Sequence, residues 1–283
     1  MATHALAGAD LLQLCKPGGL DVDGLPRLRP IGMPEVLRNL AASSLASTVR
    51  AAAVRLLAPL QMAVGVSNTC ERVVLEVTAE LVHNPLAAML EFDFRSACSL
   101  VSLAAAVVYL TRAFPCLRHY LSSVFLGSFP PRVYGCADGD STPNATGGLL
   151  ARRWLAVERG VQQGDPLGQL IHAAGMHLVV LRRAAAHLRA DVRAVHDDVV
   201  VVAALAKLPA VLTTATAAGA AVDAELAPAK CAGWSPTGAP ASAGWPARWI
   251  AGGARQISIP LGSDALLLRR SNRWRLITAV LRR

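Results

Sequence analysis

The sequence predicts an α+β fold, in which helices and short apolar strands follow one another along the chain. Residues 192–203 contain two runs of β-branched residues around Asp197-Asp198, which is the pattern of a β-hairpin. Asp165 and Pro166 form a helix start. After them, apolar residues recur at helical spacing: Leu167, Leu170, Ile171, Ala174, Leu178 and Leu181.

The first part of the chain is expected to be loop-rich over residues 1–34. Its turn signals are Lys16-Pro17-Gly18-Gly19 and Gly24-Leu25-Pro26. A helix is expected to follow over residues 34–60, because Pro34 suits a first helical turn and Val36, Leu37, Leu40 and Leu45 lie roughly on one face. A second helix is expected over residues 68–83.

The middle of the chain is more apolar. Residues 89–94 are expected to form a short strand, and the uncharged residues 96–111 a buried helix. These 16 residues fall short of the roughly 20 that a membrane span needs. Residues 136–148 are polar and contain glycine, so a mobile loop is expected there. The remaining expected elements are an Ala-rich helix, a last strand and an Arg-rich tail, over residues 210–226, 257–261 and 269–283.

The charge of the chain favours an anionic partner. The formal net charge is +9 and the pI about 9.9, which suits nucleic acid or a membrane surface. A basic soluble protein without such a partner has the same charge. The six cysteines form no CxxC pair, so no zinc site is expected. Residues 1–10 lack the basic and apolar regions of a secretory signal, so an intracellular protein is expected, nuclear or cytoplasmic and not secreted.

Three carboxylates stand in apolar surroundings. Asp93 ends the expected strand, and Asp197 and Asp198 lie in the expected hairpin. Adjacent carboxylates repel each other unless they are solvated or neutralised by a cation. Taken alone, Asp197-Asp198 is most simply a polar turn. If the hairpin lies beside the Asp93 strand, however, the three carboxylates are placed to hold two hard cations.

The segment between these carboxylates carries the most specific motif. Gly160-Val161-Gln162-Gln163-Gly164-Asp165-Pro166-Leu167-Gly168 resembles the GVxQGDPLG motif of reverse transcriptases. Other motifs of that family follow in the same order over residues 16–265. They are Lys16-Pro17-Gly18-Gly19, Arg29-Pro30-Ile31-Gly32, residues 61–71, Asp93 with Phe94 and Ala97, Val195-His196-Asp197-Asp198, Lys230-Cys231 and residues 259–264. The chain therefore resembles the reverse transcriptase domain of retrotransposons of the non-LTR-like type.

The resemblance implies a polymerase architecture. A palm, with an antiparallel sheet and helices behind it, would comprise mainly residues 86–103 and 161–268. A helical fingers subdomain would comprise mainly residues 1–85 and 104–160. Together they would form one domain, residues 1–268. The thumb is expected to be missing, and residues 269–283 would be its possible start or a solvated helix face.

The resemblance also implies the site. Asp93 and Asp197, with Asp198 beside them, would bind two Mg²⁺ ions, for which Mn²⁺ could substitute, and Phe94 would offer its backbone carbonyl. His196 is expected to fill the hairpin without binding metal. Six residues would bind nucleotide or template: Arg29, Arg38, Cys98, Gln163, Gly164 and Lys230. For Arg29 and Arg38 a plain surface arginine is an equal alternative, and for Lys230 a helix-end lysine.

The implied function is RNA-directed DNA synthesis. Nucleotides would pass from deoxynucleoside triphosphates to a DNA primer on an RNA template, without a membrane and within a larger retroelement polyprotein. Four positions depart from the family: Cys98 replaces an aromatic residue, Ser96 an Asn, Val195 a Tyr and Gln169 a common Pro. They leave open a degenerate remnant that only binds nucleic acid and, because Cys98 is small, an RNA-templated RNA polymerase. High hydropathy leaves a membrane-associated helical protein as a third alternative.

Overall fold

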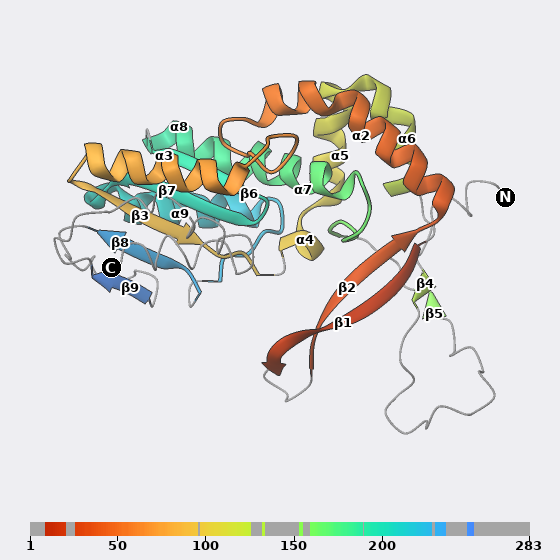
Figure 1. Ribbon diagram of the computed structural model, residues 1–283, viewed down its shortest axis with the longest axis horizontal. Coiled ribbons are helices and arrows are strands. Elements are labelled where there is room, and N and C mark those ends of the chain that lie inside the picture. The colour runs from red at the N-terminus through yellow and green to blue at the C-terminus, as the bar shows by residue number, and fades with distance from the viewer. Residues whose placement is uncertain are drawn as a thin grey trace. The chain divides into compact units, whose positions relative to one another are not determined.

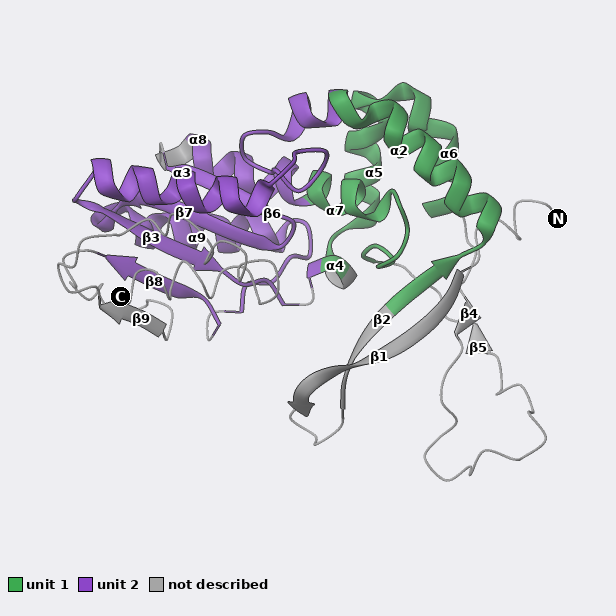
Figure 2. Cartoon of the chain, in the orientation of Figure 1, with its two compact units in different colours: residues 1–51, 98–175 green, residues 52–97, 176–283 purple. Residues whose placement is uncertain are grey.

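The chain forms two compact units. The computed structural model describes residues 9–20, 26–95, 97–125, 132–133, 153–154, 159–188, 190–227, 230–235 and 248–251. Unit 1 comprises residues 1–51 and 98–175, and unit 2 comprises residues 52–97 and 176–283 (Figure 2). Helices and mainly antiparallel strands are mixed, which confirms the α+β class. The units do not coincide with the predicted fingers and palm ranges, because residues 52–85 group with unit 2 and residues 161–175 with unit 1.

Unit 1 contains a long antiparallel ladder formed by β1 (Ala9–Leu20) and β2 (Pro26–Pro34) (Figure 1). The prediction of a loop-rich segment over residues 1–34 is therefore wrong for these strands. The predicted turn signal at residues 16–19 instead lies where the register shifts, between Cys15 and Leu20. Proline and glycine are tolerated in a strand at such an irregularity. The sheet order is β2-β1-β4-β5, with β4 (Arg132–Val133) and β5 (Arg153–Trp154).

Helices make up the rest of unit 1 as described. They are most of α2 (Val36–Leu57), most of α4 (Ala97–Leu100), α5 (Leu103–Ala113), a 3-10 turn (Pro115–Leu117), α6 (Arg118–Phe125) and most of α7 (Gly168–Met176). The predicted helix over residues 96–111 is thus interrupted. Ser102 starts α5, because its Oγ accepts the N–H of Ala105 at 3.5 Å. Helix α7 packs closely against the residues before α5, since a Cβ on Gly175 would lie 2.8 Å from a methyl carbon of Val101.

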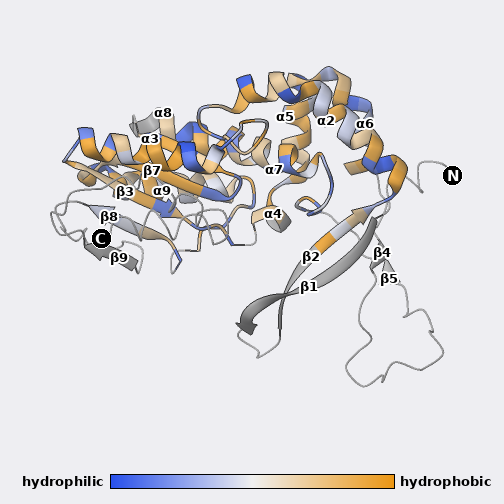
Figure 3. Cartoon of the chain, viewed as in Figure 1, coloured by the Kyte–Doolittle hydropathy of each residue, from blue (hydrophilic) through white to orange (hydrophobic). Residues whose placement is uncertain are grey.

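Unit 2 is built on a five-stranded sheet of order β6-β7-β3-β8-β9. All neighbours are antiparallel except β8 and β9. The strands are β6 (Asp191–Val195), β7 (Asp198–Ala204), β3 (Ala87–Phe92), β8 (Ala232–Ser235) and β9 (Arg248–Ala251). The predicted strand and the predicted hairpin are both confirmed. Strands β3 and β7 are mostly hydrophobic along their length, as expected for strands buried on both faces (Figure 3).

Helix α3 (Thr69–His83) covers one face of this sheet. Val73, Val77 and Leu81 of α3 belong to one buried cluster with Met89 and other residues of the sheet. This burial supplies the hydrophobic stabilisation that holds the helix in place. The predicted helix over residues 68–83 is confirmed, as is the Ala-rich helix, which is α9 (Leu208–Ala220).

The helix predicted after Asp165 is also confirmed, but it is not regular throughout. After α7 the chain forms a π-helical segment, His177–Leu181, and then α8 (Arg182–Leu188). A π turn takes up one extra residue, which shifts the buried face. As a result His177 is buried, whereas Leu178 is only half-buried. The predicted features at residues 136–148, 257–261 and 269–283 lie outside the described residues.

Burial of His177 makes the stability of the fold depend on pH. Burial, together with the charge of Arg182, lowers the pKa of His177 from 6.5 to about 4. The unfolded chain therefore takes up a proton at a higher pH than the folded chain, and stability is lost as the pH falls from about 6.5 towards 4. Between pH 7 and pH 5 we expect a His177→Leu variant to lose about 2 kcal/mol less free energy of unfolding than the wild type. Urea unfolding at both pH values measures this difference, and equal losses would contradict it.

Helix α2 (Val36–Leu57) confirms the helix predicted over residues 34–60. Among the described residues it is the one helix whose length and hydropathy would suffice to cross a membrane, with 22% of its most apolar window buried. It carries Arg38 and Arg50, and charged residues are costly inside a bilayer. Its length and composition are therefore weak evidence for a membrane span.

Candidate active site

Two acidic segments that are distant in the sequence meet at one end of the unit 2 sheet. The last pair of the β3–β7 ladder is Phe92↔Val199. Asp93 is the next residue after β3, and Asp198 is the first residue of β7. Asp93 and Asp198 therefore flank the last pair of this ladder, whose strands lie about 5 Å apart. The structure thus brings Asp93 and the acidic pair together, whereas their catalytic roles remain predictions.

The hairpin turn consists of His196 and Asp197, closed by the pair Val195↔Asp198. The prediction that Asp197 and Asp198 form the turn is wrong by one residue, since Asp198 belongs to β7. The register is fixed by the buried ladder to β3 and not by the turn preference of the carboxylates. As a result His196 has a φ of 60°, in the left-handed region, which costs a residue with a Cβ about 1 kcal/mol.

Asp93 is held by the segment that leads into β8. Its backbone carbonyl accepts the N–H of Ala227 at 2.8 Å, and its N–H lies 3.5 Å from the Sγ of Cys231. Burial raises the pKa of the Cys231 thiol. The Nζ of Lys230 lies 3.3 Å from the Oδ1 of Asp93, in a pair that is exposed on both sides. Lys230, predicted to bind nucleotide, is therefore a direct neighbour of the predicted metal ligand.

Phe94 has a buried ring and a backbone directed towards the hairpin. The ring packs edge-on against Phe92, with the ring centroids 6.3 Å apart. Phe94 and Leu226 form an isolated bridge in which the flanking residues make the hydrogen bonds. In this arrangement the carbonyl of Phe94 points to the opposite side of its segment, which is the side of β7. Metal binding by this carbonyl stays a prediction.

The residues at this end of the sheet fit Mg²⁺ in kind. Carboxylate and backbone carbonyl oxygens are the ligands that this ion prefers. In the part of the chain that the structure describes, however, no three His, Cys, Asp or Glu side chains gather closely enough to form a metal site. Mutual repulsion of carboxylates opposes such a gathering, and Asp93 is already neutralised in part by Lys230.

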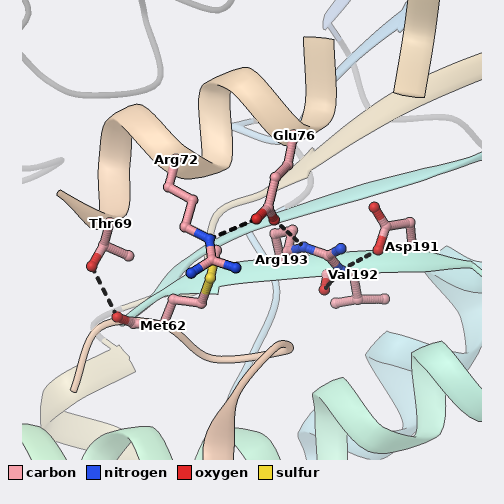
Figure 4. Close-up of polar contacts among 7 residues, drawn as sticks. All are labelled: Met62, Thr69, Arg72, Glu76, Asp191, Val192 and Arg193. Carbon is pink, nitrogen blue, oxygen red and sulfur yellow. Dashed lines mark hydrogen bonds and ion pairs between the residues drawn. The ribbon is translucent and has the colours of Figure 1, made fainter. Parts of the chain in front are cut away.

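Strand β6, which leads into the turn, is anchored to α3 by an ionic network. Glu76 lies between Arg72 and Arg193, and Arg193 also pairs with Asp191 (Figure 4). The carboxylate of Glu76 is 2.7 Å from the Nε of Arg72 and 2.8 Å from the Nε of Arg193. Burial alone would raise the pKa of Glu76, but hydrogen bonds from the two arginines outweigh it and lower the pKa. The side chain of Thr69 adds a hydrogen bond to the carbonyl of Met62 at 3.0 Å. The network therefore ties the start of the hairpin to the helix that covers it.

In unit 1, the motif containing Gln163 and Gly164 contacts β2. The N–H of Gly32 donates to the carbonyl of Gln163 at 2.7 Å. Gly164 has a φ of +119°, and a Cβ there would lie 2.1 Å from the carbonyl oxygen of Gly32. Glycine is therefore required for close approach to the chain's own backbone. Nucleotide or template binding by Gln163 and Gly164 stays a prediction.

Arg38 forms a buried ion pair with Asp165 of the same motif. Its Nε and Nη2 lie 3.1 and 2.6 Å from the Oδ2 of Asp165, and the side chains are 1% and 0% exposed. The Oδ1 of Asp165 accepts the N–H of Leu167 at 2.9 Å, which confirms the predicted role of Asp165 at the helix start. The alternative of a plain surface arginine is wrong for Arg38, because its guanidinium is buried against Asp165 and the ring of Phe125. In this structure the guanidinium is not accessible to a phosphate.

The two remaining predicted binding residues also lie in unit 1. Arg29 pairs with Leu14 in the β1–β2 ladder, and its side chain lies outside the described residues. Cys98 is half-buried in α4, and its carbonyl accepts the N–H of Val161 at 2.7 Å. The predicted site residues are thus divided between Asp93, Phe94, Asp197, Asp198 and Lys230 in unit 2, and Arg29, Arg38, Cys98, Gln163 and Gly164 in unit 1.

One residue at the hairpin was not predicted to have a role. Gln61 is 1% exposed, and its side-chain amide bonds to both backbone groups of His196. The signal in the sequence is weak: Gln61 is a single polar residue in the apolar run Leu60 to Val64. A buried polar side chain needs hydrogen-bond partners, but the sequence does not say which.

The fold is similar to that of a telomerase, which is a reverse-transcriptase-related enzyme. The solved structure is apo telomerase from Candida tropicalis truncated from its C-terminal domain, with a TM-score of 0.56 and 12% sequence identity. The match covers 81% of this chain and 50% of the truncated telomerase chain, so this chain spans about half the length of that solved structure. No model of a known protein family and no curated protein matches the sequence. The chain therefore has a reverse-transcriptase-like fold.

Proposed function

We propose that this chain is the catalytic core of an RNA-directed DNA polymerase of a non-LTR-like retroelement. It would transfer nucleotides from deoxynucleoside triphosphates to the 3′-hydroxyl of a DNA primer on an RNA template. The observation that carries the proposal is the register in which Asp93 and Asp198 flank the last β3–β7 pair at the end of the sheet, with Asp197 in the adjoining turn. The reverse-transcriptase-like fold supports it.

Two Mg²⁺ ions, or Mn²⁺ in their place, would be held by Asp93, Asp197, Asp198 and the carbonyl of Phe94. When bound, such ions activate the attacking hydroxyl and neutralise charge on the leaving pyrophosphate. Asp93 contributes a carboxylate from a position directly after β3. Its backbone is held there by the hydrogen bond from the N–H of Ala227.

Lys230 would act beside these carboxylates. Its ammonium lies 3.3 Å from the Oδ1 of Asp93, and with a nucleotide present it would bind a phosphate oxygen. The same contact would balance the acidic cluster when no nucleotide is present.

The other predicted residues would bind the template and nucleotide. Gln163 and Gly164, which contact β2, would line the nucleotide and template pocket, Cys98 would face the sugar, and Arg29 would contact phosphate. We assign Arg38 to positioning, since it holds the helix start through Asp165. The net charge of +9 suits a nucleic acid partner. The palm would carry the acidic residues, the fingers would lie mainly in unit 1, and the chain would work within a larger polyprotein.

Primer extension on a poly(rA)/oligo(dT) hybrid tests the proposal. We expect incorporation of dTTP with Mg²⁺ or Mn²⁺ and none with EDTA, since the reaction needs the ions to bring the reacting groups together. Repeating the assay on poly(dA)/oligo(dT), and with ribonucleotides, measures the template and sugar preference. A preference for ribonucleotides would support the RNA-templated RNA polymerase.

A second candidate function is nucleic acid binding without turnover. It is favoured by the absence of a three-ligand metal cluster among the described residues and by Cys98 and Val195 in place of the family's larger aromatic residues. A folded chain that binds the hybrid but does not extend it with either metal would decide for this alternative.

A further inference from the structure

The side chain of Gln61 continues the backbone pairing of β6 into the turn. Before the turn, the N–H of Ala194 donates to the carbonyl of Leu60 at 2.8 Å, and the N–H of Met62 donates to the carbonyl of Ala194 at 2.9 Å. The Gln61 segment therefore runs parallel to the end of β6. Among the described residues, no strand pairs with the turn on the side of Gln61. There the side chain of Gln61 supplies the hydrogen bonds to the turn that a neighbouring backbone would otherwise make.

Gln61 binds both polar groups of the His196 backbone. Its Nε2 donates to the carbonyl of His196 at 2.9 Å, and its Oε1 accepts the N–H of His196 at 3.0 Å. The same Oε1 also accepts the N–H of Ala63 at 3.1 Å, which fixes the amide in its orientation. An amide presents a donor and an acceptor side by side, so it is suited to this pair of contacts.

These contacts select one conformation of the turn. His196 is left-handed, a conformation that residues with a Cβ disfavour, and Asp197 follows it directly. The direction of the Asp197 side chain depends on that backbone conformation. A Gln61 amide that is 1% exposed is screened little by water, so it favours the observed turn over alternatives that would aim Asp197 elsewhere.

We infer that Gln61 is a positioning residue that holds the His196-Asp197 turn so that the Asp197 carboxylate faces the ion and nucleotide. The inference rests on the proposed function, and Gln61 itself touches neither ion nor nucleotide. It acts through the backbone of His196, from the loop between α2 and α3.

Gln61→Met tests this inference, because methionine keeps the buried volume but removes both hydrogen bonds. We expect the kcat of primer extension to fall about tenfold, with the KM for dTTP changed less than about twofold, and the Mg²⁺ concentration for half-maximal rate to rise. We also expect the amide of His196 to exchange its hydrogen about tenfold faster. Gln61→Glu, which keeps the acceptor and loses the donor, should give the same pattern.

Gln169→Met is the matched control, since Gln169 is exposed on α7, and it should leave the rate, the Mg²⁺ requirement and hydrogen exchange unchanged. If the wild type is active and the folded Gln61 variants keep its kcat and Mg²⁺ requirement, the inference about Gln61 is overturned, whereas the proposed function stands. An inactive wild type would overturn the proposed function. In that case unchanged exchange at His196 in Gln61→Met would also refute the role of Gln61 in holding the turn.

Discussion

Replacing Asp197 with Asn is expected to lower Mg²⁺-dependent primer extension about a thousandfold without unfolding the chain. Asn has the size of Asp and keeps a carbonyl oxygen, but it lacks the negative charge that a hard cation requires. A bound metal supplies several kcal/mol of transition-state stabilisation, and each ~1.4 kcal/mol is a factor of ten in rate.

The fold should tolerate this change because Asp197 is not part of the core. It lies half-buried in the turn, whose backbone is held by Gln61 through His196 and not by the Asp197 side chain. Circular dichroism and urea unfolding should therefore match the wild type. Extension would be measured under single-turnover conditions, so that the chemical step is separated from product release.

Asp223→Asn provides the matched control. Asp223 belongs to the same unit, is exposed, and has a φ of 57°, a conformation that Asn adopts readily. We expect its extension rate to equal that of the wild type. Full activity of Asp197→Asn would show that the polymerase reaction does not use this carboxylate, and the assignment of the site would fail.

Replacing Arg38 with Met is expected to destabilise the chain by about 3–5 kcal/mol. The substitution leaves the Asp165 carboxylate, 0% exposed, without its guanidinium partner. A buried charge without a partner is costly, because the protein interior solvates it poorly. The ring of Phe125, 5.4 Å from the Arg38 guanidinium, loses its cation contact at the same time. Thermal and urea unfolding followed by circular dichroism measure the loss.

A second substitution should recover most of this stability. In the Arg38→Met, Asp165→Asn double variant no charge is buried at this position, and the introduced amide keeps an oxygen for the N–H of Leu167, which Asp165 accepts at 2.9 Å. Replacing both members of a buried ion pair is often close to neutral, so we expect the double variant within about 2 kcal/mol of the wild type. This cycle separates the cost of an orphaned charge from the worth of the pair.

Arg72→Met serves as the comparison for an exposed ion pair. Arg72 is 58% exposed and contacts Glu76 one helical turn away, and such pairs contribute about 0.5 kcal/mol.

A loss of stability below about 1 kcal/mol in Arg38→Met would mean that the Asp165 carboxylate finds another partner or reaches solvent. Arg38 would then have no positioning role at the helix start.

Several features of the site could be predicted because their signals are local. The β-branched runs around residues 197–198 predict the hairpin, and the apolar run before Asp93 predicts a strand. The order of the motifs then led to the expectation that these segments converge. In the structure the predicted strand, β3, pairs directly with the second strand of the predicted hairpin, β7.

Other features could not be predicted because they depend on register. The turn is His196-Asp197 and not Asp197-Asp198, since pairing with β3 fixes which residues of the hairpin face each other. The ladder of β1 and β2 was missed for a similar reason. Pro17 and its glycine neighbours each indicate a turn, yet they lie within β1, at the irregularity where pairing with β2 is interrupted between Cys15 and Leu20.

The sequence by itself determined the α+β class, most of the helices and the identity of the acidic residues, because periodicity and motif order are properties of neighbouring residues. Only the tertiary structure decided the partners of the buried polar groups. Arg38 meets Asp165 across 127 positions, and Gln61 meets His196 across 135. Burial forces such groups to find a partner, but which partner lies within about 3 Å is set by how the helices and strands pack.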